Sequence, residues 1–517
     1  MNFSLSPTVI LLIIAGYFAL LMVVSWFTGR NANNENFFLA GRKAPWYLVA
    51  FGMIGASLSG VTFISVPGWV ESTQFSYMQM VFGYLLGYLF IGLVLMPVYY
   101  KLNLTSIYTY LEQRFGQVSY KTGAAFFLLS RTIGASFRLY LVAIVLQQFV
   151  MGPFGIPFWL TVLTTIILIW IYTYRGGINT IVWTDTLQTL CMLTAVILTV
   201  IAIGNELNHP GGIFAAVSES DYSRIFFFEG GWGNSENFFK KFLAGASIAI
   251  VMTGLDQDMM QKNLACRNIK DAQKNMFWFS IVLVFANLLF LGLGALLYIY
   301  LNQNGIEMPT RIVNGEAKVA SDLLYPTIAM EHLSPAIGIV FILGLIAAAY
   351  SSADSALTAL TTSFCVDFLG FEKKGQTTDV DENEEVLDTP DKVNTSDENR
   401  RTRFIVHISF SALLFFVILV FWYINDQSVI SELFKVAGYT YGPLLGLYFF
   451  GFFTKRNIKD RFALIVCVLA PVLTYIINMN SEAWLWGYKF DFEHLILNGL
   501  LTFIGLWLIS EKGDDRG

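Results

Sequence analysis

The 517-residue sequence contains little charge. Asp, Glu, Lys and Arg together make up 13% of the residues, whereas soluble globular proteins carry about 25%. Hydrophobic residues make up 55% of the sequence and aromatic residues 16%, which is more apolar surface than water-soluble cores can bury. Lipid must therefore solvate much of the protein. The composition excludes an ordinary soluble protein and predicts an all-α polytopic membrane protein.

Basic clusters, cysteine frameworks and histidine clusters are also missing. The net charge is −5, and no basic cluster suits a phosphate backbone, which excludes nucleic-acid binding as the main function. The cysteines have neither zinc-ligand nor disulfide spacing, so we expect them only to pack. The histidines lack the spacing of metal ligands, and we predict no enzyme activity and no cofactor. These residues are Cys191, Cys266, Cys365 and Cys467, and His209, His332, His407 and His494.

Long apolar runs dominate what is present. About 20 apolar residues cross a bilayer as a helix, and about thirteen segments qualify. We expect the first to remain as a helix, because no positive n-region precedes it and no small-residue cleavage site follows it. The predicted spans lie near residues 7–28, 45–66, 76–99, 120–151, 157–174, 178–204, 237–260, 274–301, 333–362, 404–424, 432–453, 460–479 and 492–510.

Positive charge gathers in alternate loops, and positive loops remain in the cytoplasm. This pattern predicts a multi-pass protein of the plasma or inner cell membrane, with its N-terminus outside and its C-terminus inside. Segment 369–403 is then cytoplasmic, and its polar composition predicts disorder. Segments 205–236 and 302–332 are predicted to be outer loops with short helices. The residues behind this assignment are Arg30, Arg42, Lys43, Lys101, Arg114, Lys121, Arg175, Lys262, Arg267, Lys270, Lys274, Lys455, Arg456, Lys459 and Arg461.

Four ionisable residues lie inside predicted spans, where charge is costly and often functional. Arg131 and Arg138 are two helical turns apart, so both side chains lie on the same side of one helix. Each could instead be a snorkelling arginine or part of a structural ion pair. Asp185 could likewise form a structural salt bridge. The fourth, Asp354, belongs to a larger polar group.

That polar group lies in AAAYSSADSALTALTT, residues 347–362. A serine in a membrane helix often bonds only to its own backbone, but five polar groups on one helical face favour a binding site. Sodium is a hard cation that prefers oxygen ligands, which hydroxyls and a carboxylate supply. The five are Ser351, Ser352, Asp354, Ser355 and Thr358.

Small residues interrupt two of the predicted helices. The first interruption lies in FGMIGASLSGVTFISVPG, residues 51–68, which contains the triplet Gly-Ala-Ser at residues 55–57. The second lies in residues 242–257, which have the same triplet near their start and break at a glycine. An unwound helix can offer backbone carbonyls to an ion where it lines a polar cavity. Two interrupted helices in corresponding halves predict an inverted-repeat transporter.

Five motifs in order make the sequence similar to the sodium/solute symporter family, whose members include bacterial sodium/galactose, sodium/proline and sodium/sialic acid symporters. The resemblance extends to about residue 478. It implies a core of two inverted five-helix repeats, about 45–204 and 237–453, with one extra helix before it (1–30) and two after it (454–517). The motifs are NENFFLAGRKAPW (34–46), LTSIYTYLEQRFG (104–116), GGINTIVWTDTLQ (176–188), QKNLACRN (261–268) and AAAYSSADSA (347–356).

The same resemblance implies secondary active transport, in which sodium as coupling ion and a small organic solute enter the cell together by alternating access. It implies a main sodium site made by the backbone carbonyls of Gly55, Leu58 and Ala348 and the hydroxyls of Ser351 and Ser352. Some members hold a second sodium, which implies a second cation site here of Asp185, Ser351, Asp354 and Ser355. Asp354 stands where sialic acid symporters have serine, and its carboxylate could strengthen this site or take up a proton. Asp185 and Asp354 are expected to lie near each other across facing helices.

The resemblance also implies solute contacts. They fall on Ser59, Thr62, Gln79, Arg138 and Met252. Galactose-type relatives have a glutamine in place of Thr62 and an aromatic residue in place of Met252, while a guanidinium such as that of Arg138 suits a carboxylate. We therefore predict a carboxylate-bearing solute, such as sialic acid or an organic or amino acid, and keep a sugar as the alternative.

A membrane sensor or a channel remains open as an alternative, whereas a membrane enzyme is not expected. A membrane enzyme would need a nucleophile with a base, or a metal cluster. A sensor would need an appended domain, and only about seven residues follow the last predicted span. A sodium-independent channel would give flux that neither saturates nor needs a sodium gradient. We expect sodium, the solute and membrane lipid as partners, with no nucleic acid and no obligatory protein partner.

Overall fold

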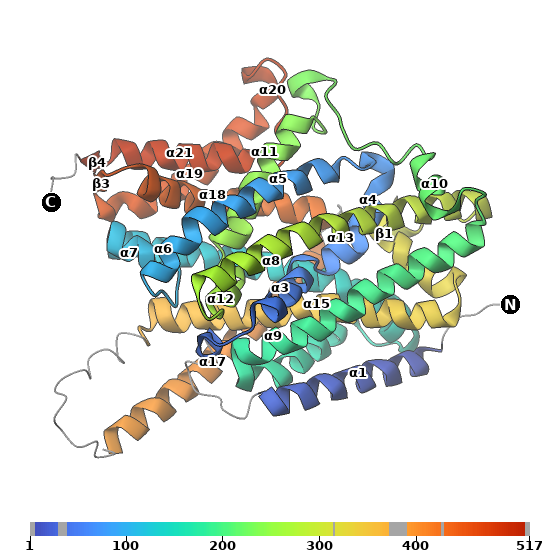
Figure 1. Ribbon diagram of the computed structural model, residues 1–517, viewed down its shortest axis with the longest axis horizontal. Helices are drawn as coiled ribbons and strands as arrows, with labels where there is room; N and C mark the ends of the chain where they lie inside the picture. Colours follow the sequence, from blue (N-terminus) through green and yellow to red (C-terminus); the bar gives the residue numbers. More distant parts are fainter. Residues whose placement is uncertain (1–5, 29–38, 314–315, 372–389, 425–428, 512–517) are drawn as a thin grey trace.

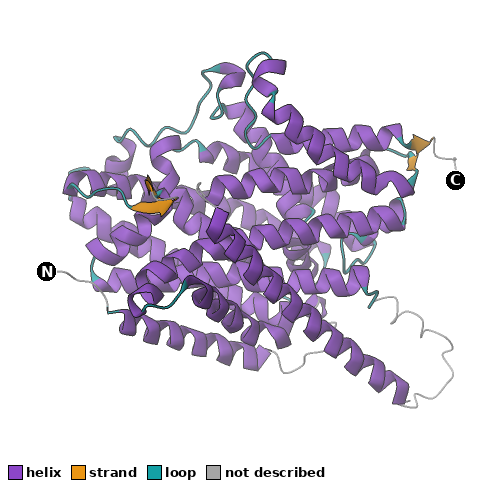
Figure 2. Cartoon of the chain, turned by 180° about the vertical axis from the view of Figure 1, so that it is seen from behind, coloured by secondary structure: helices purple, strands orange, loops and turns teal. Residues whose placement is uncertain are grey.

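The computed structural model describes residues 6–28, 39–313, 316–371, 390–424 and 429–511. These residues form a bundle of long helices that run roughly along one axis (Figure 1). Strands occupy only two small patches of the described chain (Figure 2). Strand β1 (Thr310–Val313) pairs antiparallel with β2 (Glu316–Val319), and β3 (Asn457–Ile458) pairs antiparallel with β4 (Ser510–Glu511).

The helices follow the apolar runs of the sequence. The α-helices are α1 (Pro7–Thr28), α3 (Trp46–Ser57), α4 (Gly60–Thr73), α5 (Tyr77–Phe90), α6 (Met96–Lys101), α7 (Thr109–Arg114), α8 (Gln117–Leu146), α9 (Phe158–Leu207), α10 (Gly212–Ser218), α11 (Phe238–Ala249), α12 (Gln257–Leu264), α13 (Ile269–Asn304), α14 (Leu324–Thr327), α15 (Pro335–Ser363), α17 (Pro390–Ile424), α18 (Val429–Phe453), α19 (Ala463–Met479), α20 (Ser481–Trp484) and α21 (His494–Leu508). Segments of π-helix are η2 (Ile91–Leu95), η3 (Gln147–Met151), η6 (Ile250–Gly254), η8 (Ile328–His332) and η9 (Phe364–Phe368). Short 3₁₀ turns are η1 (Ala40–Arg42), η4 (Gly152–Phe154), η5 (Gly231–Gly233), η7 (Ser321–Leu323) and η10 (Asp460–Phe462).

Eight of the described helices are long and apolar enough to cross a membrane, and two bent pairs raise that number to ten. Three more predicted spans coincide with the apolar segments 158–173 and 494–508 and with α18. Helix α9 contains two predicted spans, which meet at a kink where Gly177 (φ 52°, ψ −142°) departs from helical geometry. The total of about thirteen spans stays a prediction.

The predicted disorder of segment 369–403 is wrong for its last part. Helix α17 begins at Pro390 and extends beyond the rest of the bundle (Figure 1). Its apolar part, Asn399–Ile424, is long enough to cross a membrane. Extending such a helix beyond the membrane costs little free energy, because the unfavourable first turn is already formed. The composition of the segment does not include this effect of the neighbouring helix. Residues 372–389 of this segment lie outside the described residues.

Helix α15 lies in the interior and carries the polar group found in the sequence. It packs against α9, α8 and α3. Every residue from Gly344 to Ser363 is buried. The hydroxyl and carboxyl groups of this helix therefore face protein rather than lipid, which avoids the cost of exposing them to the hydrocarbon core.

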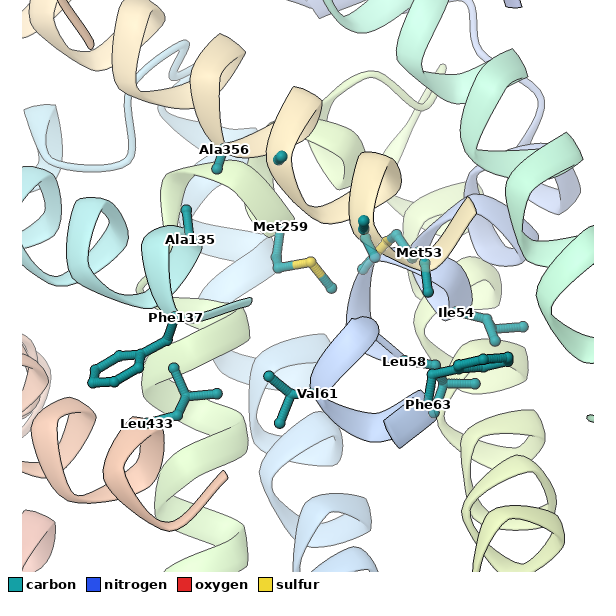
Figure 3. Packing of buried hydrophobic residues seen from close by; sticks show 14 of the residues in the cluster. Met53, Ile54, Leu58, Val61, Phe63, Ala135, Phe137, Met259, Ala356 and Leu433 are labelled. Carbon is teal, nitrogen blue, oxygen red and sulfur yellow. The ribbon is translucent and has the colours of Figure 1, made fainter. Parts of the chain in front are cut away.

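Two helices are broken in the middle of the bundle. Helices α3 and α4 meet at an angle of 53°, and the α11/η6 segment meets α12 at 63°. Hydrophobic side chains lie around this region, among them Leu58 at the first break, Met259 on α12 and Leu433 on α18 (Figure 3). The predicted interruptions are thus present in the structure, and each places free backbone groups in the interior.

Close packing of α5 against α11 supports this arrangement. A Cβ on Gly83 would overlap the backbone of Phe242, and a Cβ on Gly245 would overlap the backbone of Met80. The two helices therefore touch through their backbones at these positions. Small residues are typical of such contacts within membranes.

Candidate functional site

A cavity of about 80 Å³ lies beside the break between α3 and α4. This space exceeds the roughly 10 to 15 Å³ that one water molecule needs by the same measure. Polar and aromatic side chains from several helices meet there. The described lining residues are Ala56, Ser57, Leu58, Ser59, Val61, Thr62, Tyr77, Tyr84, Tyr88, Arg131, Arg138, Ile248, Ala249, Met252, Thr253, Met259, Leu283, Asn287, Ile430, Leu433 and Phe434.

The break itself is formed by two residues outside helical geometry. Leu58 has φ −80° and ψ 65°, and Ser59 has φ −69° and ψ 177°. The last four carbonyls of a helix have no partner within that helix, which applies here to the end of α3, including Gly55. Gly55 also needs to lack a side chain, because its Cβ would overlap the Oγ1 atom of Thr189 in α9.

The predicted main sodium site brings this break together with α15. Ala348, Ser351 and Ser352 are buried on α15, which packs against α3. The hydroxyl of Ser351 donates to Oδ1 of Asp185 at 2.7 Å. The hydroxyl of Ser352 is buried and has no hydrogen-bond partner among the described residues. An unpartnered buried oxygen is costly unless something else binds it, so this donor set fits a cation.

The two arginines of α8 have different surroundings. Arg131 forms ion pairs with Asp258 and, at 3.8 Å, with Asp256, which is the structural alternative foreseen for it. Arg138 is 8% exposed and lines the cavity. Its guanidinium forms no ion pair or hydrogen bond with a residue that the structure describes, and its buried Nε atom is unpartnered. The cavity thus contains one guanidinium that has no ion-pair partner in the described part of the protein.

Among the other predicted solute contacts, Ser59, Thr62 and Met252 line the cavity. Gln79 does not. Its Nε2 atom donates to the carbonyl of Glu236 at 2.9 Å, and its Oε1 atom accepts from the amide of Phe227 at 3.0 Å. Both ends of the amide therefore hold the segment 227–236 against α5, and the role of Gln79 in binding solute stays a prediction.

The prediction missed several lining residues. Asn287 on α13 has a buried Oδ1 atom with no partner in the described chain. Tyr77, Tyr84 and Tyr88 lie at seven- and four-residue spacing on α5 and share the face toward the cavity. This spacing, and an asparagine in the middle of an apolar span, were the signals available in the sequence.

The predicted second cation site gathers around Asp185 on α9. Its Oδ1 atom accepts the hydrogen bond from Ser351, and its Oδ2 atom accepts from Ser355 at 3.5 Å. Asp354 lies within electrostatic range of Asp185, as expected for facing helices. The Oδ2 atom of Asp354 accepts from the hydroxyl of Tyr172 at 2.8 Å. These residues are all fully buried.

Lys262 joins this cluster, which the sequence analysis did not foresee. Its Nζ atom lies 2.7 Å from Oδ2 of Asp185. We expected Lys262 in a cytoplasmic loop, but it lies on α12 with a side chain that is 2% exposed. Helix α12 begins at Gln257, the side chain of the preceding Asp256 caps its first amides, and the 63° bend turns it back into the bundle. This bend buries the lysine, and the residue type at position 262 does not indicate it in the sequence.

Comparisons with known proteins identify relatives of the chain. The sodium:solute symporter family profile matches residues 37–386. The sodium/sialic acid symporter NanT of Aliivibrio fischeri is 25% identical over 475 residues, covering 88% of this chain and 85% of the relative. The sodium/sialic acid symporter SiaT of Proteus mirabilis is 24% identical, covering 86% and 84%. The human sodium/iodide cotransporter is 28% identical over 267 residues, covering 50% and 41%.

Solved structures confirm the predicted fold class. A substrate-bound, outward-open Na⁺-coupled sialic acid symporter matches with a TM-score of 0.77 at 20% identity, covering 98% of this chain and 99% of the other. The nucleobase-cation-symport transporter Mhp1 matches with a TM-score of 0.53 at 13% identity, covering 92% and 95%. The chain therefore has the all-α, inverted-repeat architecture of these transporters.

Proposed function

The chain belongs to the sodium:solute symporter family, and from this premise we propose that its central cavity binds a solute bearing a carboxylate. The protein is a multi-pass membrane transporter, not an enzyme, and it couples the symport of a small solute to sodium. The observation that carries the proposal is the guanidinium of Arg138 in the cavity lining, which forms no ion pair with a described residue.

A buried charge without a partner is strongly unfavourable, so a bound anion would stabilise Arg138. A planar guanidinium binds a carboxylate through two parallel hydrogen bonds. The nearby Arg131 already has two carboxylate partners, which leaves Arg138 as the group for the solute. Ser59 and Asn287 add polar groups for the rest of the molecule.

The relatives favour sialic acid as the first candidate within this class. NanT and SiaT are named sodium/sialic acid symporters and align with most of this chain. Sialic acid is a carboxylic acid with several hydroxyls, which matches a cavity lined by one free guanidinium and by hydroxyl and amide groups. A neutral sugar would leave Arg138 uncompensated, so it remains the second candidate.

The test compares an acid with its uncharged analogue. Uptake of radiolabelled sialic acid and of its methyl ester is measured in proteoliposomes with an inward sodium gradient. We expect the acid to be transported, and Arg138→Lys to raise its KM by at least about tenfold because the lysine loses the planar fork. The methyl ester serves as the control, since its weak transport should not change in the variant. Equal transport of acid and ester, or an unchanged KM for Arg138→Lys, would refute the carboxylate.

Sodium is proposed to bind at the main sodium site, between the carbonyls of Gly55, Leu58 and Ala348 and the hydroxyls of Ser351 and Ser352. The buried, unpartnered hydroxyl of Ser352 supports this assignment. An ion held there joins α3 to α15 and favours the arrangement that binds solute. By linkage, the solute then raises sodium affinity by the same factor.

The proposed orientation has the N-terminus outside and the C-terminus in the cytoplasm. Its support is the distribution of positive loops. Two exposed positions test it: Lys270, which follows α12, and Trp486, which is 97% exposed near α20. In intact cells, a membrane-impermeant maleimide should label Trp486→Cys but should reach Lys270→Cys only after permeabilisation. The reverse pattern would invert the topology.

A further inference from the structure

The cluster around Asp185 holds a cation that belongs to the protein itself. Lys262 places its ammonium 2.7 Å from Oδ2 of Asp185, and both side chains are buried. The same carboxylate accepts hydrogen bonds from Ser351 and Ser355. Asp354 lies within electrostatic range of the ammonium. Hydroxyl and carboxylate oxygens of this kind are the ligands that sodium prefers, but here a lysine side chain lies among them.

Resting on the proposed sodium-coupled function, we propose that the ammonium of Lys262 is the permanent cation of the second cation site, so that the transporter binds one sodium ion rather than two. Sodium at Asp185 would have to share the carboxylate of this residue with the ammonium of Lys262. The two positive charges would repel each other in a site with little water to screen them. The second sodium therefore does not fit while Lys262 is in place.

The surroundings of the two carboxylates support this role. Asp185 has its charge compensated directly by Lys262. Asp354 is held separately, because Oδ2 accepts from the hydroxyl of Tyr172 at 2.8 Å and Oδ1 accepts from the amide of Ser355 at 2.5 Å. Each carboxylate thus has its own hydrogen-bond donors, and Lys262 supplies the positive charge that acts on both.

The position of Lys262 in the chain makes this cation different from a sodium ion. It lies on α12, the second half of the broken helix pair, whereas Asp185 lies on α9. The ammonium joins these two helices and is tethered to the protein, so it cannot leave on the cytoplasmic side. Only the main sodium site then exchanges its ion during transport, and one sodium enters per solute.

Equilibrium binding of radioactive sodium to the purified full-length protein tests the proposal without knowledge of the solute. We expect one sodium ion per wild-type chain. Lys262→Gln removes the ammonium at similar length, and sodium should then occupy the vacated place and raise the count to two. Lys262→Arg is the matched control, because it keeps the positive charge and should bind one.

The outcomes separate this inference from the function on which it rests. Two sodium ions bound to the wild type, or one bound to a folded Lys262→Gln, would overturn the tethered cation and leave sodium coupling intact. No sodium bound to the wild type would overturn the proposed sodium sites and this inference with them. If Lys262→Gln fails to fold, the paired variant Lys262→Gln with Asp185→Asn removes both charges and should bind one. A count of two for this pair would also refute the role of Asp185.

Discussion

Ser352→Ala is the sharpest test of the main sodium site. The buried hydroxyl of Ser352 has no hydrogen-bond partner among the described residues, so its removal breaks no hydrogen bond of the described protein and should not destabilise the fold. Loss of one oxygen ligand from a desolvated ion should cost about 1 to 3 kcal/mol. At about 1.4 kcal/mol for each factor of ten, sodium half-saturation should rise about 5- to 150-fold.

The assay is sodium-dependent uptake in proteoliposomes, with thermal unfolding measured on the same preparation. Ser136→Ala is the matched control, because it makes the same substitution on α8 and the hydroxyl of Ser136 is also buried and unpartnered in the described structure. It lies outside the proposed site, so its sodium half-saturation should equal that of the wild type. An unchanged value for Ser352→Ala, or an equal rise in both variants, would refute the assignment.

Two further predictions concern the scaffold around the cavity. Arg131→Met should lower the free energy of unfolding by about 3 to 5 kcal/mol, because it leaves Asp256 and Asp258 buried without their cation. Chemical denaturation measures this free energy, and a loss below about 1 kcal/mol would contradict the ion pair. Gly55→Ala should cost about 1 to 3 kcal/mol and reduce uptake, because its Cβ meets Oγ1 of Thr189. Adding Thr189→Ala should restore thermal stability, and the absence of any rescue would contradict this contact.

Several features of this protein were determined by the sequence alone. The shortage of charge required a membrane protein, because too few polar residues exist to cover a water-soluble surface. Small residues near Gly55 predicted the break in the first core helix, since they weaken a helix wherever it occurs. The spacing of Ser351 and Ser352 placed both hydroxyls on a polar stretch of one helix. Each of these conclusions depends on neighbours in the chain or on overall composition.

Only the tertiary structure decided which charged groups compensate each other. Arg131 and Arg138 are equivalent by sequence, yet the first meets two carboxylates of the α12 region and the second meets none that is described. The sequence predicted Lys262 in a loop, whereas in the structure the bend before α12 places it beside Asp185. The segment 227–236, which binds Gln79, likewise approaches from far along the chain. Such pairings arise from the way separate helices pack, and the free energy of a buried charge depends on the partner that packing supplies.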